Sequence, residues 1–175
     1  MANTQAGYSW LSILVHWLGA VSIVALFVTH EGPRDSFAFQ FHVAGGALIG
    51  LFLIWRVSRR AVRGFPPKPD QHPLFNLAST VVIWGLLTCI IVLVITGYLL
   101  PWSVGQPIDM AGLFDIPSPF PASRAFHEIM EEAHDIAGHL IVPLALLHVL
   151  GAFKHLIWDR DGIMQRMLMG RNGGA

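Results

Sequence analysis

Charged side chains are scarce in this sequence, and cysteine is almost absent. Asp, Glu, Lys and Arg make up 13% of the 175 residues, hydrophobic residues make up 54%, and the mean hydropathy is +0.56. A chain this apolar and this poor in charge is not an ordinary soluble domain. The single cysteine, Cys89, excludes an intramolecular disulfide and a thiolate metal site. The net charge of zero gives no indication of a nucleic-acid partner, and we expect none.

Long hydrophobic runs are what the sequence does contain. Four windows without a charged residue form the centres of four predicted spans across the lipid bilayer, at about 10–30, 37–56, 74–100 and 126–157. We therefore expect an all-α membrane protein, with one domain over residues 1–175 that forms a four-transmembrane-helix bundle. A soluble helical bundle is the alternative, but its helices would show polar stripes at helical spacing.

The segments around these spans differ in composition. The first nine residues lack Lys and Arg and no clear cleavage site follows the first apolar run, so we expect a retained span rather than a signal peptide. The proline-rich stretch 101–122 predicts an irregular loop. The tail over 159–170 has an amphipathic pattern, which predicts a helix along the membrane surface.

Basic residues are distributed unevenly between the connections. Nine of the eleven lie from the end of the second span to the start of the third, or from the end of the fourth span into the C-terminal tail, whereas Arg34 and Arg124 lie in the other two connections. Positively charged connections remain on the cytoplasmic side of a membrane. We therefore expect both termini in the cytoplasm and the acidic third connection outside. The nine residues are Arg56, Arg59, Arg60, Arg63, Lys68, Lys154, Arg160, Arg166 and Arg171.

Four of the nine histidines have matched depths in the predicted spans. His134 and His148 are 14 residues apart, which places them within ~40° of one helix face and about 21 Å apart along the axis. His16 lies near the same membrane edge as His148, and His42 lies near the same edge as His134. Ionisable residues inside spans are costly and usually functional. We therefore expect two pairs, His16 with His148 on the cytoplasmic side and His42 with His134 on the outer side.

Glycine spacing selects the same four histidines. Each has a glycine three or four positions later, and no other histidine in the sequence does. A planar macrocycle can lie against a helix only where side chains are small. Two imidazoles at one level suit axial ligation of haem iron, whereas zinc requires three or four ligands. A hydrogen-bonded core histidine is the alternative at each position. We interpret the pattern as two haems b, bound without covalent attachment because no C-x-x-C-H motif is present. The packing glycines are Gly19, Gly46, Gly138 and Gly151.

The other histidines carry weaker indications. His155 would face the cytoplasmic mouth of the bundle, where an imidazole can donate a proton to a quinone carbonyl. His127 would contact a haem propionate or have no role. His30 and His72 are expected in solvated loops, and His139 is expected to face a neighbouring span or the lipid headgroups.

The motifs around these residues resemble the bacterial cytochrome b561 family over nearly the whole chain. The most specific are the His-Trp of "ILVHWLGAVSIV", the His-x-x-x-Gly of "FHVAGGALIGLFLIWRVSRR", and the two histidines 14 apart in "EEAHDIAGHLIVPLALLHVLGAFKH". The resemblance implies a four-helix bundle in the bacterial inner membrane that holds two haems b. It implies the same four ligands, His16, His42, His134 and His148.

The resemblance also implies an activity. Bacterial relatives include superoxide oxidases, so we expect transmembrane electron transfer and a superoxide:ubiquinone oxidoreductase that oxidises superoxide on the periplasmic side and reduces quinone. One alternative is a non-catalytic cytochrome b subunit, which would pass electrons between the quinone pool and a periplasmic or membrane redox partner. Another is a transporter or structural protein in which the histidines relay protons.

Basic side chains are candidate partners of the haem propionates through charge-assisted hydrogen bonds. The candidates are Arg56, Arg59, Lys154 and Arg124, although charges at these positions also set topology. Arg124 and Arg34 are the outer cations and have six acidic residues nearby, which weakens the case for electrostatic steering of superoxide. The third span lacks the early histidines and the later proline that relatives often carry. The resemblance therefore supports the haem ligands of this chain more strongly than it supports the substrate.

Overall fold

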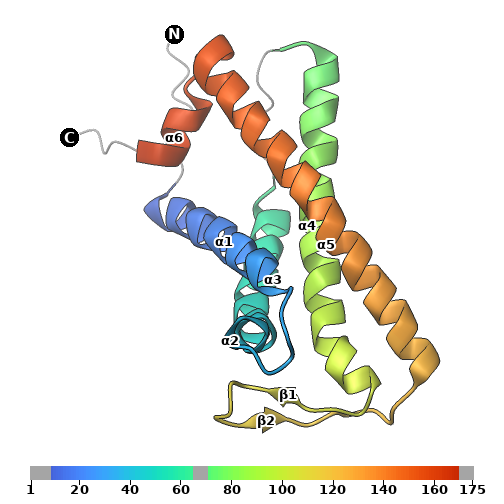
Figure 1. Ribbon diagram of the computed structural model, residues 1–175. Helices are drawn as coiled ribbons and strands as arrows, with labels where there is room; N and C mark the ends of the chain where they lie inside the picture. Colours follow the sequence, from blue (N-terminus) through green and yellow to red (C-terminus); the bar gives the residue numbers. More distant parts are fainter. Residues whose placement is uncertain (1–8, 65–70, 170–175) are drawn as a thin grey trace.

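The computed structural model describes residues 9–64 and 71–169 of the chain (Figure 1). Lys68 and Arg171, which contribute to the predicted charge asymmetry, lie outside the described residues. Four helices are long and apolar enough to cross a membrane, over Trp10–Thr29, Phe37–Val62, Pro73–Ser103 and Arg124–Asp159. The four predicted spans are therefore confirmed as helices of membrane-crossing length.

The first and second spans differ in regularity. Helix α1 covers Trp10–Thr29, and the side chain of Ser9 caps it by accepting from the Ser12 N–H. The second span is composite: α2 covers Phe37–Gln40, a π-helical turn η1 covers Phe41–Gly45, and α3 covers Gly46–Arg63. A π-helical turn inserts one extra residue per turn and is often found at functional positions. Here it carries His42.

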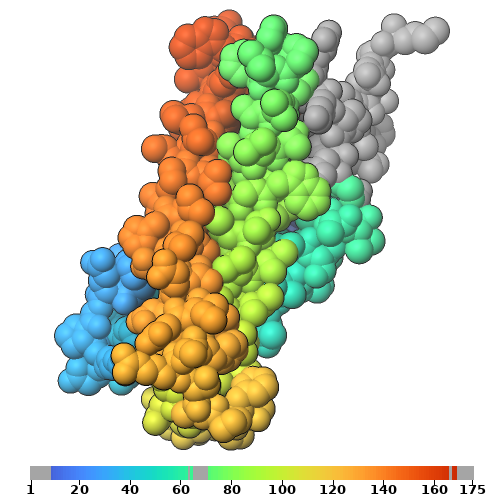
Figure 2. Space-filling model, turned by 90° about the vertical axis from the view of Figure 1, so that its right-hand side faces the viewer, coloured from blue at the N-terminus to red at the C-terminus, as the bar shows by residue number. Residues whose placement is uncertain are grey.

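The third and fourth spans are the two longest helices. Helix α4 covers Pro73–Ser103 and α5 covers Arg124–Lys154, followed by a second π-helical turn, η2, over His155–Asp159. Figure 2 shows α4 and α5 side by side along one face of the molecule. The short helix α6, Ile163–Met169, lies in the predicted amphipathic tail, and the Trp17 indole N–H of α1 donates to the Met167 carbonyl at 3.3 Å.

The stretch predicted as an irregular loop is more ordered than expected. Helix α4 continues through Pro101, and two short strands, β1 (Ile108–Asp109) and β2 (Asp115–Ile116), pair antiparallel. Ile108 is 1% exposed and packs with Ala47 of α3, which anchors the hairpin to the bundle. Strands of two residues carry no readable alternation, so the sequence pattern could not reveal them. We call the end of the bundle that carries β1 and β2 the hairpin end, and the opposite end the α6 end.

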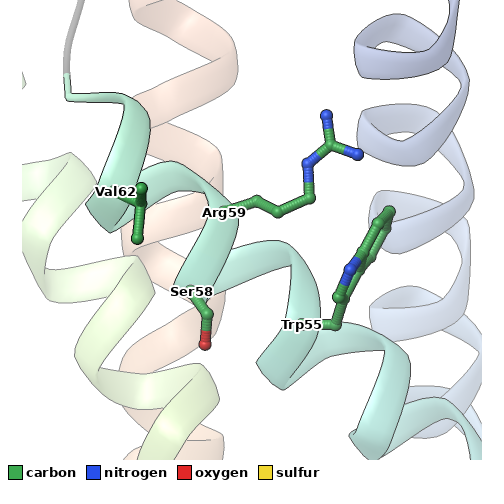
Figure 3. Close-up of a pocket in the computed structure, with 4 residues that line it drawn as sticks. All are labelled: Trp55, Ser58, Arg59 and Val62. Carbon is green, nitrogen blue, oxygen red and sulfur yellow. The ribbon is translucent and has the colours of Figure 1, made fainter.

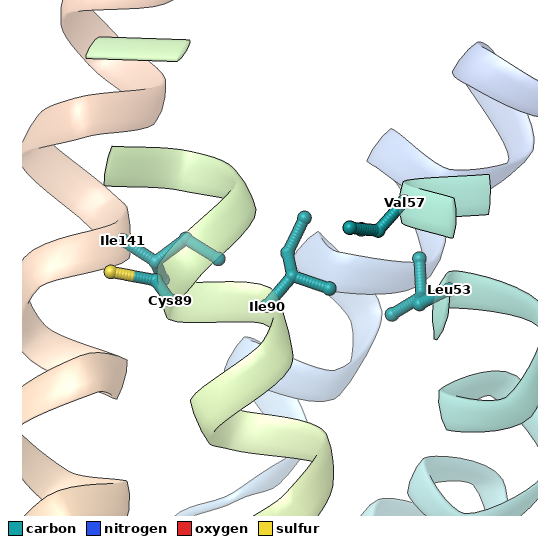
Figure 4. Packing of buried hydrophobic residues seen from close by; sticks show 5 residues of the cluster. All are labelled: Leu53, Val57, Cys89, Ile90 and Ile141. Carbon is teal, nitrogen blue, oxygen red and sulfur yellow. The ribbon is translucent and has the colours of Figure 1, made fainter. Parts of the chain in front are cut away.

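A compact apolar cluster joins three of the spans. Its buried members are Leu53 and Val57 of α3, Cys89 and Ile90 of α4, and Ile141 of α5 (Figure 4). Glycine allows α4 and α5 to approach closely, because a Cβ on Gly85 would lie 3.0 Å from Leu144 Cδ1. Small residues at such crossings are typical of helices packed in a membrane.

The outward faces of the helices are apolar as well. Val21 is 66% exposed, Val28 is 70% exposed and Leu48 is 62% exposed, and large apolar side chains of α4 and α5 are similarly uncovered. Such continuous apolar surface is unfavourable in water but suits contact with lipid. With four spans of sufficient length, the chain is a multi-pass membrane protein.

We expect Gly85→Leu to destabilise the α4–α5 crossing. The new side chain must displace Leu144, and overpacking of this kind costs about 1–3 kcal/mol. The thermal unfolding midpoint in detergent should fall. The matched control is Val81→Leu, one turn earlier on α4, where the side chain is 59% exposed and the larger group has room. Equal midpoints for the two variants would contradict the packing described.

Candidate functional site

Two pairs of histidine rings face each other inside the bundle. The ring centres of His16 on α1 and His148 on α5 are 6.2 Å apart, with an interplanar angle of 65°. The ring centres of His42 on η1 and His134 on α5 are also 6.2 Å apart, with an interplanar angle of 83°. The structure therefore brings together the two pairs predicted from depth. We call the first the α6-end pair and the second the hairpin-end pair. Both include a histidine of α5, and we call the position of each pair along the bundle its level.

The hairpin-end pair is oriented by oxygen acceptors. His42 Nδ1 donates to the Leu26 carbonyl at 2.8 Å. His134 Nδ1 lies 2.8 Å from Thr96 Oγ1, and the Thr96 hydroxyl donates its own proton to the Val92 carbonyl at 2.7 Å, so the imidazole is the donor. A neutral ring protonated at Nδ1 has its free lone pair on Nε2. Both rings are therefore held in the form that binds a metal, as outer hydrogen bonds commonly do for histidine ligands.

The α6-end pair has a different neighbour. Arg56 Nη2 lies 2.6 Å from His16 Nδ1, and because a guanidinium can only donate, Nδ1 accepts. In this arrangement the proton of neutral His16 is on Nε2. Ligation through Nε2 would require the proton on Nδ1, so Arg56 must give up this hydrogen bond when a metal is bound. The Arg56 stem lies beside the predicted packing glycine: a Cβ on Gly19 would be 3.3 Å from Arg56 Cδ.

The spacing of both pairs fits a metal ion held from two sides. Two imidazoles on opposite sides of one ion, with each nitrogen ~2 Å from it and roughly 1 Å from its own ring centre, have ring centres about 6 Å apart. The observed 6.2 Å agrees at both levels. Two nitrogen donors per level leave the other positions of the iron to a macrocycle, so the donor set suits axial ligation of haem.

The glycines leave space beside the rings. Nothing lies within 4 Å of a Cβ built on Gly151. At Gly46 and Gly138 such an atom would meet one leucine methyl carbon each, at 3.9 Å. Gly97 was not singled out by its sequence spacing, yet a Cβ there would lie 3.6 Å from His134 Cε1. At Gly46, Gly138 and Gly151 the backbone is therefore largely uncovered, which a planar group requires, whereas Gly19 is packed against the side chains of Arg56 and Leu53.

The candidate propionate partners have different surroundings. Arg56 contacts His16, whereas the Arg124 guanidinium is exposed and pairs with Glu128 at 2.8 Å. Lys154 Nζ lies 2.5 Å from Asp159 Oδ2, donates to Gln71 at 3.2 Å and lies 4.5 Å from the centre of the Phe75 ring.

Arg59 belongs to a surface groove on α3. Its guanidinium lies 4.8 Å from the centre of the Trp55 ring, and the two side chains project to the same side of the helix (Figure 3). Together with Ser58 and Val62 they line an open groove of about 270 Å³. The groove is lined by residues of α3 and includes none of the paired histidines.

The remaining histidines have partners of other kinds. His155 Nδ1 lies 2.8 Å from Asp161 Oδ2 and 3.1 Å from Asp159 Oδ2. His127 Nδ1 donates to the buried Ser103 hydroxyl at 2.8 Å, because that hydroxyl donates to the Leu100 carbonyl. The exposed His139 is bonded to the Asp135 carbonyl at 2.9 Å.

His30 and His72 lie in connections, as expected. The His30 ring stacks on Phe27, with ring centres 5.1 Å apart, and the His72 side chain accepts from the Leu74 N–H and caps α4.

Membrane-spanning helices that enclose facing histidines are the arrangement of a membrane cytochrome. Comparison with known proteins agrees with this class. The family described as prokaryotic cytochrome b561 matches residues 7–170. A curated relative, Cytochrome b561 homolog 2 of Escherichia coli (strain K12), is 27% identical in an alignment of 181 residues. The alignment covers 95% of this chain and 93% of the relative. The chain belongs to the prokaryotic cytochrome b561 family, and this membership supports haem b binding and electron transfer in the membrane.

We expect single alanine variants to separate the two levels. His148→Ala should remove haem from the α6-end pair and leave the hairpin-end pair loaded, and His134→Ala should do the reverse. Each purified variant should contain half the haem of the wild type, measured per protein by absorbance. His139→Ala, an exposed position on the same helix, is the control and should keep the full content. Complete haem loss from both single variants would contradict the assignment of levels.

Proposed function

We propose that the two histidine pairs hold two haems b and that the protein carries electrons between the two faces of the membrane. His42 and His134 would be the axial ligands at the hairpin end, and His16 and His148 at the α6 end. The observation that carries this proposal is the shared ring separation of 6.2 Å at both levels. A haem b, when bound, supplies a one-electron carrier at each level.

The chain's own residues define the path between the two levels. Ile141 lies on α5 seven residues from both His134 and His148, is 3% exposed, and belongs to the apolar cluster shown in Figure 4. Seven residues of helix correspond to about 10 Å, so the cluster lies between the levels and excludes water from the space between them. Electrons would therefore cross through packed apolar side chains, without a proton accompanying them.

The proposed orientation places the hairpin end in the periplasm and the α6 end in the cytoplasm. It rests on the basic residues: Arg56, Arg59 and Arg60 lie in the last turns of α3, and Lys154 ends α5. Positive charge at the helix ends and in short connections favours the cytoplasmic side. Under this proposal both chain termini lie in the cytoplasm and the protein resides in the bacterial inner membrane.

The specific activity that we propose is superoxide:ubiquinone oxidoreductase. Two superoxide anions would each give one electron at the hairpin end and leave as two molecules of oxygen. One quinone would take up the two electrons and two protons at the α6 end and leave as quinol. His155 is suited to the proton transfer, because an imidazole bonded to carboxylates at 2.8 and 3.1 Å can donate a proton and be reprotonated. The likeness of the motifs to superoxide oxidases supports this choice.

One observation favours a second candidate, the non-catalytic electron-transfer subunit. The outer cation Arg124 is paired with Glu128, and Glu131, Glu132 and Asp135 follow on the same helix. A net negative surface repels a small anion but suits a basic redox partner. In this case electrons would pass between the quinone pool and a protein partner at the hairpin end.

Turnover under a superoxide flux distinguishes the two functions. Purified protein supplied with enzymatically generated superoxide and a short-chain ubiquinone should form quinol, measured by its ultraviolet absorbance. His148→Ala should abolish quinol formation, because the α6-end level is lost. Full haem content without any quinol formation would contradict the superoxide oxidase and favour the electron-transfer subunit.

We expect His155→Phe to affect quinone reduction specifically. Loss of one hydrogen bond to a quinone oxygen should raise the apparent KM for quinone by roughly tenfold. Haem content should not change, since His155 lies outside both pairs. His139→Phe is the control, because that side chain is 76% exposed and lies at the middle of α5, 16 residues from His155. An unchanged KM in His155→Phe would place the quinone elsewhere.

A further inference from the structure

The two histidine pairs differ in the charge of their immediate surroundings. At the hairpin end, Nδ1 of each ring faces a neutral oxygen acceptor, the Leu26 carbonyl or Thr96 Oγ1, at 2.8 Å. At the α6 end, His16 Nδ1 faces the Arg56 guanidinium at 2.6 Å. At the hairpin end each ring therefore faces one neutral acceptor, whereas at the α6 end His16 lies beside a permanent cation.

We propose that Arg56 makes the α6-end level the stronger electron acceptor of the two, so that electrons entering at the hairpin end are drawn to the α6 end. This inference rests on the proposed function, because it requires a haem at each level. In this role Arg56 would not bind the iron, and its positive charge would act on the α6-end level from beside His16.

Two physical effects act in the same direction. An acceptor on Nδ1 makes an imidazole a more basic ligand and favours the oxidised iron, which applies at the hairpin end. A cation near the iron disfavours the more positive, oxidised state and favours the added electron, which applies at the α6 end. The effect of a charge at this distance is large in an apolar interior and small in water. Half-buried Arg56 lies between these limits.

Arg56 remains close to its level when the site is filled. The proton must then lie on His16 Nδ1, so the guanidinium turns away from that atom. Its stem is fixed by packing, because Arg56 Cδ lies next to Gly19 and the side chain starts from the same helix as the cluster residues Leu53 and Val57. Arginine keeps its charge at any pH that the protein meets. The positive charge therefore stays beside His16 in either arrangement of the side chain.

The hairpin end has no comparable charge among the described neighbours of its rings. The ring of His30 is 6.3 Å from that of His42, but His30 Nε2 lies 3.7 Å from the carboxylate of Glu31. A proton on His30 would be offset by that carboxylate. Asp135 follows His134 directly in the sequence and adds a negative charge. The charge near the rings is therefore positive at the α6 end and negative at the hairpin end.

Optical redox titration of the purified, haem-loaded protein tests the inference. The wild type should show two components, and the one lost in His148→Ala should have the higher midpoint potential. Arg56→Met keeps an apolar stem against Gly19 and removes the charge. It should lower the midpoint of that component and leave the other unchanged, whereas Arg56→Lys should restore most of the difference. Arg160→Met, which removes an exposed positive charge at the same end of the bundle, is the matched control and should shift neither component.

The outcomes separate this inference from the proposed function. Two components with no shift in Arg56→Met, or an equal shift of both, would overturn the role of Arg56 and leave the two-haem proposal intact. A higher midpoint for the component retained in His148→Ala would overturn it as well, even if Arg56→Met did not fold. A single component in a wild type that contains two haems per chain would also overturn the role of Arg56, whereas a content of one haem per chain would instead contradict the proposed two levels.

Discussion

Half-buried imidazole rings among apolar side chains are the constraint on which the rest of this structure depends. A polar nitrogen inside a membrane bundle is costly unless it has a partner, and each ring has two nitrogens. Nδ1 of His42, His134 and His16 is bonded to a carbonyl, a hydroxyl and a guanidinium respectively. A metal ion between the facing rings would satisfy Nε2 of His42 and His134 directly, and Nε2 of His16 once its proton has moved to Nδ1. The uncovered glycines near the rings are consistent with that requirement.

The distribution of charge connects topology with electron transfer. In the proposed orientation an electron moves toward the negative cytoplasmic side, which costs about 2.3 kcal/mol per 100 mV of membrane potential. A stronger acceptor at the α6 end offsets part of this cost. The basic residues that end the second span would thus serve two purposes, holding that end in the cytoplasm and, through Arg56, favouring the electron there. In this proposal the apolar cluster around Ile141 would separate the levels and keep the electron from being accompanied by protons.

The sequence could reveal the spans and the facing histidines because both depend on regular helical geometry. Charge-free windows marked the four helices, and the 14-residue spacing on α5 with nearby glycines marked the pairs. The acceptors of Nδ1 could not be found in this way, since Thr96 is 38 residues from His134 and forms part of an ordinary apolar helix. The hairpin was missed because its strands are two residues long. Arg56 was expected beside a propionate, and its contact with His16 depends on the crossing of α1 and α3.

The haem content of the purified wild-type protein tests the central claim most directly. Protein produced with ample haem and extracted under denaturing conditions should release all of its haem, because the attachment is not covalent. The reduced-minus-oxidised spectrum should be of the b type, and the measured ratio should be two haems per chain. A ratio of one, or a colourless protein, would contradict the account of two iron sites held between facing histidines.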